Sequence, residues 1–96
     1  MGTIPKGTIE YPNGDVYDGE IKNQQAHGAG NMTYSGGDRY VGRFLNDDRS
    51  GVGTMYTPSG VYTGSFKNDM FHGKGVFQFN NGAIYNGEKI FFFKNF

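Results

Sequence analysis

One stretch decides the fold: Tyr62-Thr-Gly-Ser-Phe-Lys-Asn-Asp-Met-Phe-His-Gly-Lys-Gly-Val-Phe-Gln-Phe-Asn-Asn-Gly82. It opens with a Tyr-x-Gly triplet, carries a Gly-x-Gly pair eleven residues after the tyrosine, and closes on a glycine. The same pattern starts at Tyr17 and at Tyr40, so the period is 23 residues, shortened once to 22. Self-similarity at such a period is typical of a repeat protein, in which each unit is one small supersecondary element.

The composition limits the classes of protein to consider. The chain has 96 residues, with nine basic and nine acidic side chains and no cysteine. One domain accounts for this length, and neither a disulfide framework nor a zinc–thiolate site is possible. No two basic residues are adjacent, which argues against nucleic-acid binding. No apolar run approaches the ~20 residues of a membrane span, and the first residues lack a signal-peptide core, so we expect a cytoplasmic protein.

Glycine and aromatic residues follow the repeat and favour strands. The chain has 17 glycines, which disfavour helix because each interior glycine costs roughly 1 kcal/mol relative to alanine. Tyr17, Gly19 and Ile21 alternate with polar residues, as expected of a half-buried strand. Asn13-Gly14 is typical of a tight hairpin turn. The pattern predicts eight short strands joined by such turns and by six-residue loops at 22–27, 45–50 and 67–72.

These strands predict an all-β fold, a single-layer antiparallel meander that is extended and slightly twisted. Glycines on one face leave room for an aromatic ring of a neighbouring strand to lie flat on the backbone. One unit cannot bury its aromatic face alone, so we expect the units to stabilise each other by stacking.

The repeated pattern resembles the MORN (membrane occupation and recognition nexus) repeat. The shared features are Tyr-x-Gly-x-Phe, a loop ending in His-Gly-x-Gly, an aromatic strand and Asn-Gly. Within a single domain, 1–96, the units are a half unit 7–16, full units 17–39, 40–61 and 62–84, and an incomplete unit with an apolar tail, 85–96. The departures are Thr57 for an aromatic residue, Ser50 for histidine, the shortened turn at Gly60-Val61, and Lys89 for Ile or Phe.

The resemblance implies an aromatic-lined groove on an open sheet. Tyrosine suits a surface that is partly apolar and partly wet, and an extended peptide or a helix with apolar anchors could fill such a groove. The residues expected to line a partner-binding groove are Tyr17, Tyr34, Tyr40, Tyr62, Phe79 and Tyr85.

Two further segments are candidate contact sites. The tail contains Phe91, Phe92, Phe93 and Phe96, an apolar edge of a kind that proteins usually avoid exposing. It could cap its own sheet, pair with another chain as an assembly edge, or insert into a membrane surface. Met70-Phe71 is a smaller apolar pair, which we expect to be exposed in the third loop.

Catalytic, metal and cofactor sites are not expected. His27 and His72 occupy equivalent positions two units apart, too far to share a metal ion. The Gly-x-Gly pairs do not open helices, which phosphate-binding loops require. No side-chain arrangement suggests an activated nucleophile.

The resemblance therefore predicts a non-catalytic scaffold or docking module for protein–protein assembly. Members of this family occur in axonemes and other cytoskeletal assemblies, so a cytoskeletal or axonemal partner is expected, or a second copy bound through the C-terminal edge. The alternatives are a phospholipid-binding membrane tether and an accessory repeat lobe of a larger enzyme.

Overall fold

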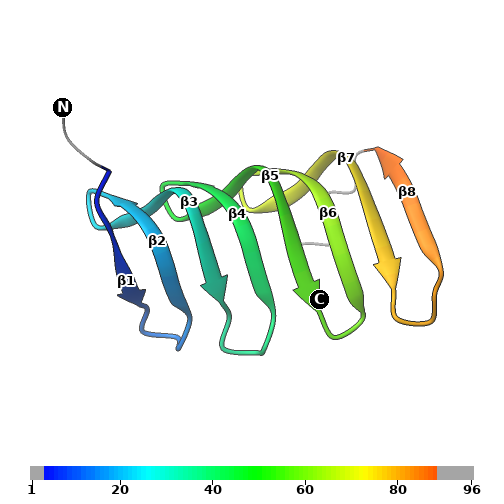
Figure 1. Cartoon of the computed structure of the whole chain (residues 1–96), viewed down its shortest axis with the longest axis horizontal. Helices are drawn as coiled ribbons and strands as arrows, with labels where there is room; N and C mark the ends of the chain where they lie inside the picture. The colour runs from blue at the N-terminus through cyan, green and yellow to red at the C-terminus, as the bar shows by residue number, and fades with distance from the viewer. Residues whose placement is uncertain (1–3, 89–96) are drawn as a thin grey trace.

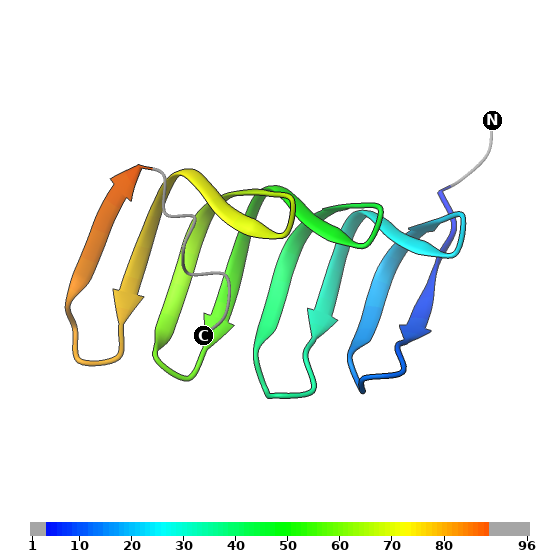
Figure 2. The ribbon, with the colours of Figure 1, turned by 180° about the vertical axis from the view of Figure 1, so that it is seen from behind.

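The computed structural model describes residues 4–88, which form one antiparallel sheet of eight strands in sequence order (Figure 1). The strands are β1 (Lys6–Glu10), β2 (Val16–Lys22), β3 (Gln25–Thr33), β4 (Arg39–Leu45), β5 (Asp48–Thr57), β6 (Gly60–Lys67), β7 (Met70–Phe79) and β8 (Ile84–Glu88). Figure 2 shows from behind that the strands stand side by side in one layer. The predicted all-β, single-layer meander is confirmed.

The three connections at the upper edge of Figure 1 are tight turns. They are Asn23-Gln24, Asn46-Asp47 and Asn68-Asp69, and both residues of each have φ between 49° and 72°. Two successive positive φ angles define a type I′ hairpin turn, whose twist matches that of the strands. The predicted six-residue loops are therefore wrong. The missed signal was an asparagine in every unit, a residue that tolerates this conformation.

A bulge follows each tight turn and bends the hairpin. In unit 17–39, Gly19 pairs with Gly30 and Ile21 with Ala26, so Glu20 alone faces the three residues 27–29. The other units repeat the register shift at Arg43 and at Ser65. A glycine with φ between 70° and 98° lies in every bulge, because bulges of this kind use the left-handed conformation. The upper hairpin ends consequently curl (Figure 1).

Tyr17, Tyr40 and Tyr62 form the centre of the core. Each is 0% exposed, and the Tyr17 ring occupies the space that a Cβ atom on Gly30 would need. Its hydroxyl donates a hydrogen bond to the Glu20 carbonyl (2.6 Å). Tyr40 and Tyr62 bond in the same way to the carbonyls of residues 43 and 65, both at 2.9 Å. The hydroxyl thus satisfies the carbonyl of the residue at the bulge, which phenylalanine could not do.

Aromatic rings connect the units in a continuous row. Phe44 makes edge-to-face contacts with Tyr17 and with Tyr40, both with ring centroids 5.0 Å apart. Phe66 then joins Tyr40 (4.9 Å) to Tyr62 (5.2 Å). Edge-to-face pairs are favourable beyond the area they bury. Each phenylalanine therefore stabilises its own unit and the one before it.

The tight turns of the second and third full units also bind the strand of the preceding unit. Asp47 N donates to Ala26 O (2.9 Å), and its Oδ1 accepts from Ala26 N (2.8 Å) and from the Tyr11 hydroxyl (2.7 Å). Asp69 N donates to Arg49 O (3.1 Å), and its Oδ1 accepts from Arg49 N (3.1 Å) and Nε (2.8 Å). We call these contacts the Asp47 junction and the Asp69 junction.

The turns at the opposite edge are joined less uniformly. Asp15 Oδ1 accepts a hydrogen bond from Ser35 N (2.8 Å) in the neighbouring turn. Asp38 is the equivalent of Asp15 one unit later, but the residue equivalent to Ser35 is Pro58, which has no N–H to donate. The β5–β6 turn contacts the β7–β8 turn instead through Asn80 N and Ser59 O (3.0 Å).

Candidate functional site

The predicted aromatic groove is mostly filled by the protein itself. Tyr17, Tyr40 and Tyr62 have no exposed surface, so the expectation that they line an open groove is wrong. The curled hairpin ends bring Ala26, Arg49 and Phe71 into the core beside them, and these three residues are buried too. The bulge that causes the curl was not recognised in the sequence, which is why the face was expected to be open.

The other three groove residues retain some exposure. Tyr34 is half-buried, with the Arg49 guanidinium 5.3 Å from its ring centre. Phe79 and Tyr85 are exposed, and Tyr85 is 44% accessible although it is the equivalent of the three buried tyrosines. Phe44 and Phe66 cover Tyr17 and Tyr40 from the following units, whereas Tyr85 lies in the last strand of the described residues. Within residues 4–88, the exposed aromatic side chains are thus those of Tyr56, Phe79 and Tyr85 in β5–β8.

The predicted loop contact Met70-Phe71 is not an exposed loop. Both residues belong to β7, Met70 is half-buried, and Phe71 is only 2% exposed. The Phe71 ring stacks on Tyr62 with centroids 3.8 Å apart and an interplanar angle of 14°. Phe71 therefore covers Tyr62 from within its own unit. The predicted assembly edge of Phe91, Phe92, Phe93 and Phe96 lies outside the described residues.

The opposite face of the sheet is exposed and differs between its two halves. In β5–β8, two cross-strand rows contain no charged residue. We call these eight residues the C-terminal face: Thr54, Thr63, Val76 and Asn86 in one row, and Tyr56, Val61, Gln78 and Ile84 in the other. The same rows in β1–β4 contain Glu10, Asp18 and Arg39. Sequence reasoning missed this contrast because it followed the inward residues.

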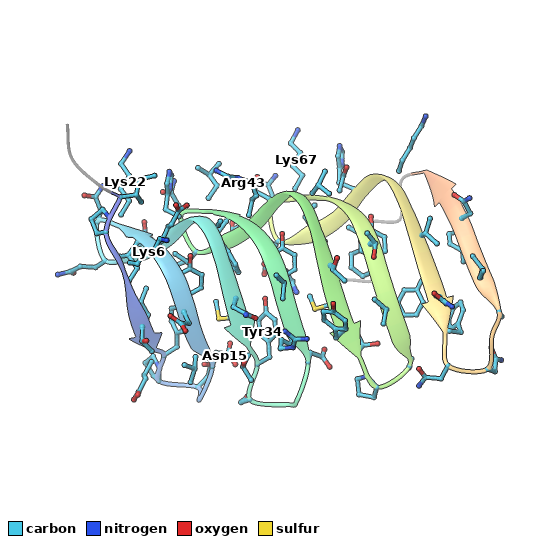
Figure 3. The ribbon with its side chains drawn as sticks, viewed as in Figure 1. Lys6, Asp15, Lys22, Tyr34, Arg43 and Lys67 are labelled. Atoms are coloured by element: carbon cyan, nitrogen blue, oxygen red, sulfur yellow. The ribbon has the colours of Figure 1, made fainter. Side chains whose placement is uncertain are left out.

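Cationic side chains lie along the edge that carries the tight turns. Figure 3 shows Lys22, Arg43 and Lys67 there, on three different strands. Asp47 and Asp69 lie at the same turns, but their carboxylates bond to the preceding unit. The edge therefore presents these three cations outward, together with the exposed carboxylate of Asp48. Lys22 and Lys67 occupy equivalent positions in their units. The sequence therefore contained a sign of this row of cations, which was missed because only adjacent basic residues were considered.

Burial also changes the acidity of the core tyrosines. Removal of water raises the pKa of Tyr40 to about 12, although the positive charge of Arg49 acts in the opposite direction. Desolvation likewise raises the pKa of Tyr17 and of Tyr62 above the ordinary value. These hydroxyls stay protonated donors in the core at neutral pH.

Residues 4–88 contain neither a metal-binding cluster nor a membrane-spanning helix. This part of the chain brings no three His, Asp or Glu side chains together in a way that could hold a metal ion. It also has no helix with the length and apolarity to cross a bilayer.

The comparison with protein families agrees with the repeated geometry. The MORN repeat model matches residues 6–16, 17–39, 40–61 and 62–84. The chain therefore belongs to the MORN repeat family, and the repeats mark it as an interaction module for proteins or membrane lipids. Comparison with curated proteins finds no match.

Proposed function

We propose that the chain is a non-catalytic docking module for protein–protein assembly, and that the C-terminal face is its contact surface. The observation that carries the proposal is that the eight residues of this face include no charged one; Arg39 of β4 lies at its border, 4.4 Å from the centre of the Tyr56 ring. Ile84 is 63% exposed, and Tyr56 and Val76 of the same face are exposed too. The neighbouring Val52, in β5, is 66% exposed. Interface centres are depleted in charge and enriched in aromatic residues.

The partner is expected to be a protein with an uncharged apolar surface. The curled hairpin ends cover the tyrosine face, whereas the C-terminal face has no second layer. Sheets in proteins normally bury an apolar face against another element at about 10 Å. Phe79 and Tyr85 are exposed at the same end of the molecule, but on the other face of the sheet. Resemblance to family members in axonemes favours a cytoplasmic partner in a cytoskeletal or axonemal complex, which localisation of a tagged protein would test.

A matched pair of variants tests the docking surface. Val76 and Val41 are both 38% exposed and lie in the same cross-strand row, but on the C-terminal and N-terminal halves. Val76→Lys should abolish co-purification with the partner, since it places a charge in an apolar interface, whereas Val41→Lys should leave co-purification intact. Equal binding by both variants, with unchanged thermal unfolding, would contradict the proposal.

A phospholipid-binding tether is the second candidate, and the cationic edge favours it. Lysine and arginine near an anionic bilayer contribute about 1 kcal/mol each, and Lys22, Arg43 and Lys67 lie along one edge (Figure 3). Co-sedimentation with vesicles should then require anionic lipid and decline with salt. It should also weaken in Lys67→Gln. Absence of sedimentation at low salt would exclude this function.

A further inference from the structure

The first and last strands of the described sheet are complementary halves of the repeat. In each full unit, an opening strand with the Tyr-x-Gly triplet is followed by a return strand with the Gly-x-Gly pair. β8 is an opening strand, because its triplet starts at Tyr85. β1 is a return strand: Gly7 holds the place of Gly30, since each pairs with the triplet glycine of the next strand. Within residues 4–88, β1 and β8 each have one neighbouring strand.

Gly7 differs from the equivalent glycines in what lies on it. A Cβ atom on Gly30, Gly53 or Gly75 would lie 2.2–2.3 Å from a tyrosine hydroxyl of the opening strand beside it. On Gly7, the nearest atom of the described residues would be the terminal methyl of Ile21, at 3.2 Å. The tyrosine that covers a return-strand glycine in the full units comes from the side of β1 that faces away from β2.

Tyr85 has the orientation of the buried tyrosines but not their burial. A Cβ atom on Gly87 would lie 3.0 Å from the Tyr85 hydroxyl, close to the 2.8 Å between Gly19 and the Tyr17 hydroxyl. Tyr85 is nevertheless 44% exposed, whereas Tyr17 is 0% exposed. Within residues 4–88, the sheet has no return strand on the far side of β8. Gly7 and Tyr85 therefore each lack the kind of partner that the other provides.

We propose that a second copy of this chain adds its β1 to the open side of β8, so that the two strands complete a repeat unit between the copies. Gly19 pairs with Gly30 in the first full unit, so Gly87 pairs with the second copy's Gly7. The Tyr85 ring then lies on that glycine. Backbone N–H and C=O groups of an edge strand are available for such pairing.

The charges of the two strands agree with this register. In the first full unit, the carboxylate of Glu20 accepts a hydrogen bond from Ala29 N (2.6 Å). Glu88 and Lys6 hold these two positions in the sequences of β8 and β1. Residues of opposite charge therefore meet between the copies, and complementary charge helps to fix the register of an interface.

The contact is heterologous, because β8 of one copy binds β1 of the next and each copy keeps one free edge. Such contacts continue into open filaments unless the rotation between copies closes a ring. The two edges are separate from the C-terminal face, whose residues point out of the opposite side of the sheet. The proposal is therefore independent of the docking function assigned to that face.

Sedimentation velocity of the whole chain over a concentration series tests the proposal with two blocked variants. Gly7→Ala blocks β1, because its methyl takes the space of the Tyr85 ring, while in its own chain it meets only the flexible end of Ile21. Tyr85→Lys blocks β8. The parent chain should form a series of oligomers, and each variant alone should associate about tenfold more weakly or less. An equimolar mixture of the two should stop at the dimer, since one free β8 and one free β1 remain.

Two controls keep the outcomes distinct. Thr8→Ala changes the outward face of β1 and should assemble like the parent chain, and Val76→Lys should also assemble while it loses protein docking. A parent chain that stays monomeric at all concentrations would overturn the proposal. NMR contacts between the Tyr85 ring and Phe91, Phe92 or Phe93 of the same chain would then identify the tail as the group that covers Tyr85. Dimers formed by either blocked variant alone would indicate a symmetric contact and would overturn it too.

Discussion

The Asp47 and Asp69 junctions use the same backbone geometry for different chemistry. In both, an aspartate of a type I′ turn exchanges hydrogen bonds with a residue of the preceding unit. The bound residue is Ala26 at the first junction, and the aspartate also accepts from a tyrosine. At the second it is Arg49, whose side chain is 8% exposed and forms an ion pair with Asp69 at 2.8 Å. The backbone contact defines the repeat, while the side chains determine the strength of each junction.

Phe71 occupies the same position as Ala26 and Arg49 in the last full unit, and its replacement should have the largest effect. Phe71→Ala would remove the ring stacked on Tyr62 and leave a cavity, at a cost of about 3–5 kcal/mol in the free energy of unfolding. Urea denaturation monitored by tyrosine fluorescence would measure this loss. A loss below about 1 kcal/mol would show that the third unit does not depend on this ring.

Asp69→Ala should have the second-largest effect. The substitution would remove the carboxylate that pairs with the buried guanidinium of Arg49. The backbone carbonyl of residue 69 (2.5 Å) would then be the remaining oxygen partner of this guanidinium at the junction. Breaking a buried ion pair costs about 3–5 kcal/mol, and partial exposure of Asp69 reduces this to about 2–4 kcal/mol. Asp69→Asn keeps an acceptor for Arg49 N, so its loss should be smaller. If the two variants are equally stable in urea, the charge is not what matters at this junction.

Alkaline pH should destabilise the core that lies beneath both junctions, because this core contains buried tyrosines. The pKa of Tyr40 is raised to about 12 in the folded chain, so above pH ~10 the unfolded chain loses this proton first. The stability is complete below pH ~10 and falls as the pH rises toward 12, by roughly 2–3 kcal/mol for this residue. The midpoint temperature of thermal unfolding, measured between pH 8 and 12, would report this loss of stability. A midpoint that is constant to pH 12 would contradict the prediction.

Asp47→Ala should weaken the first junction by less than Asp69→Ala weakens the second. Its Oδ1 accepts from two neutral donors, Ala26 N and the Tyr11 hydroxyl, and the loss of such bonds costs about 1–2 kcal/mol. Tyr11→Phe removes one of them and should cost about half as much. Native-state hydrogen exchange at Ala26 N would report the change. If Asp47→Ala and Asp69→Ala lose the same free energy of unfolding, the proposed difference in strength between the two junctions is contradicted.

The smallest effect is expected at the opposite edge, where Asp15 and Asp38 are equivalent. Asp15→Ala should cost about 1 kcal/mol, because it removes the acceptor for Ser35 N. Asp38→Ala should change stability by less than about 0.5 kcal/mol. Burial raises the pKa of Asp38, so its charged form is less favourable in the folded chain. Differential scanning calorimetry would compare the stability lost by the two variants. A larger loss in Asp38→Ala than in Asp15→Ala would contradict this prediction.

The repeat, the strands and the glycine–aromatic packing were predictable because they depend on local patterns. A period of 23 residues, alternation within Tyr17–Ile21 and glycines at fixed spacing are visible without coordinates. The burial of Tyr17 was not predictable in the same way. It depends on the bulge opposite Glu20 and on the curl of the next hairpin, which are set by contacts between units.

The candidate surfaces also could not be predicted from local sequence patterns. Alternation assigns Val76 and Val41 to the outward face. Only the register across the strands shows that their shared row contains Asp18 in β2 and no charged residue in β5–β8. Likewise, Gly7 and Tyr85 lie in the first and last strands of the described sheet, and their difference from the equivalent residues of the full units is visible only in burial and contacts.

By itself, the sequence determined that this chain is an all-β repeat protein whose units each place a tyrosine against glycines. This follows because periodicity and the conformational freedom of glycine act over a few residues. The tertiary structure alone decided which faces stay open. The bulges bend the hairpin ends toward the preceding units, where Asp47 and Asp69 of the turns bind, and this bend closes the tyrosine face. The exposed surface is therefore on the other face and along the turn edge, since burial depends on neighbours that are distant in the sequence.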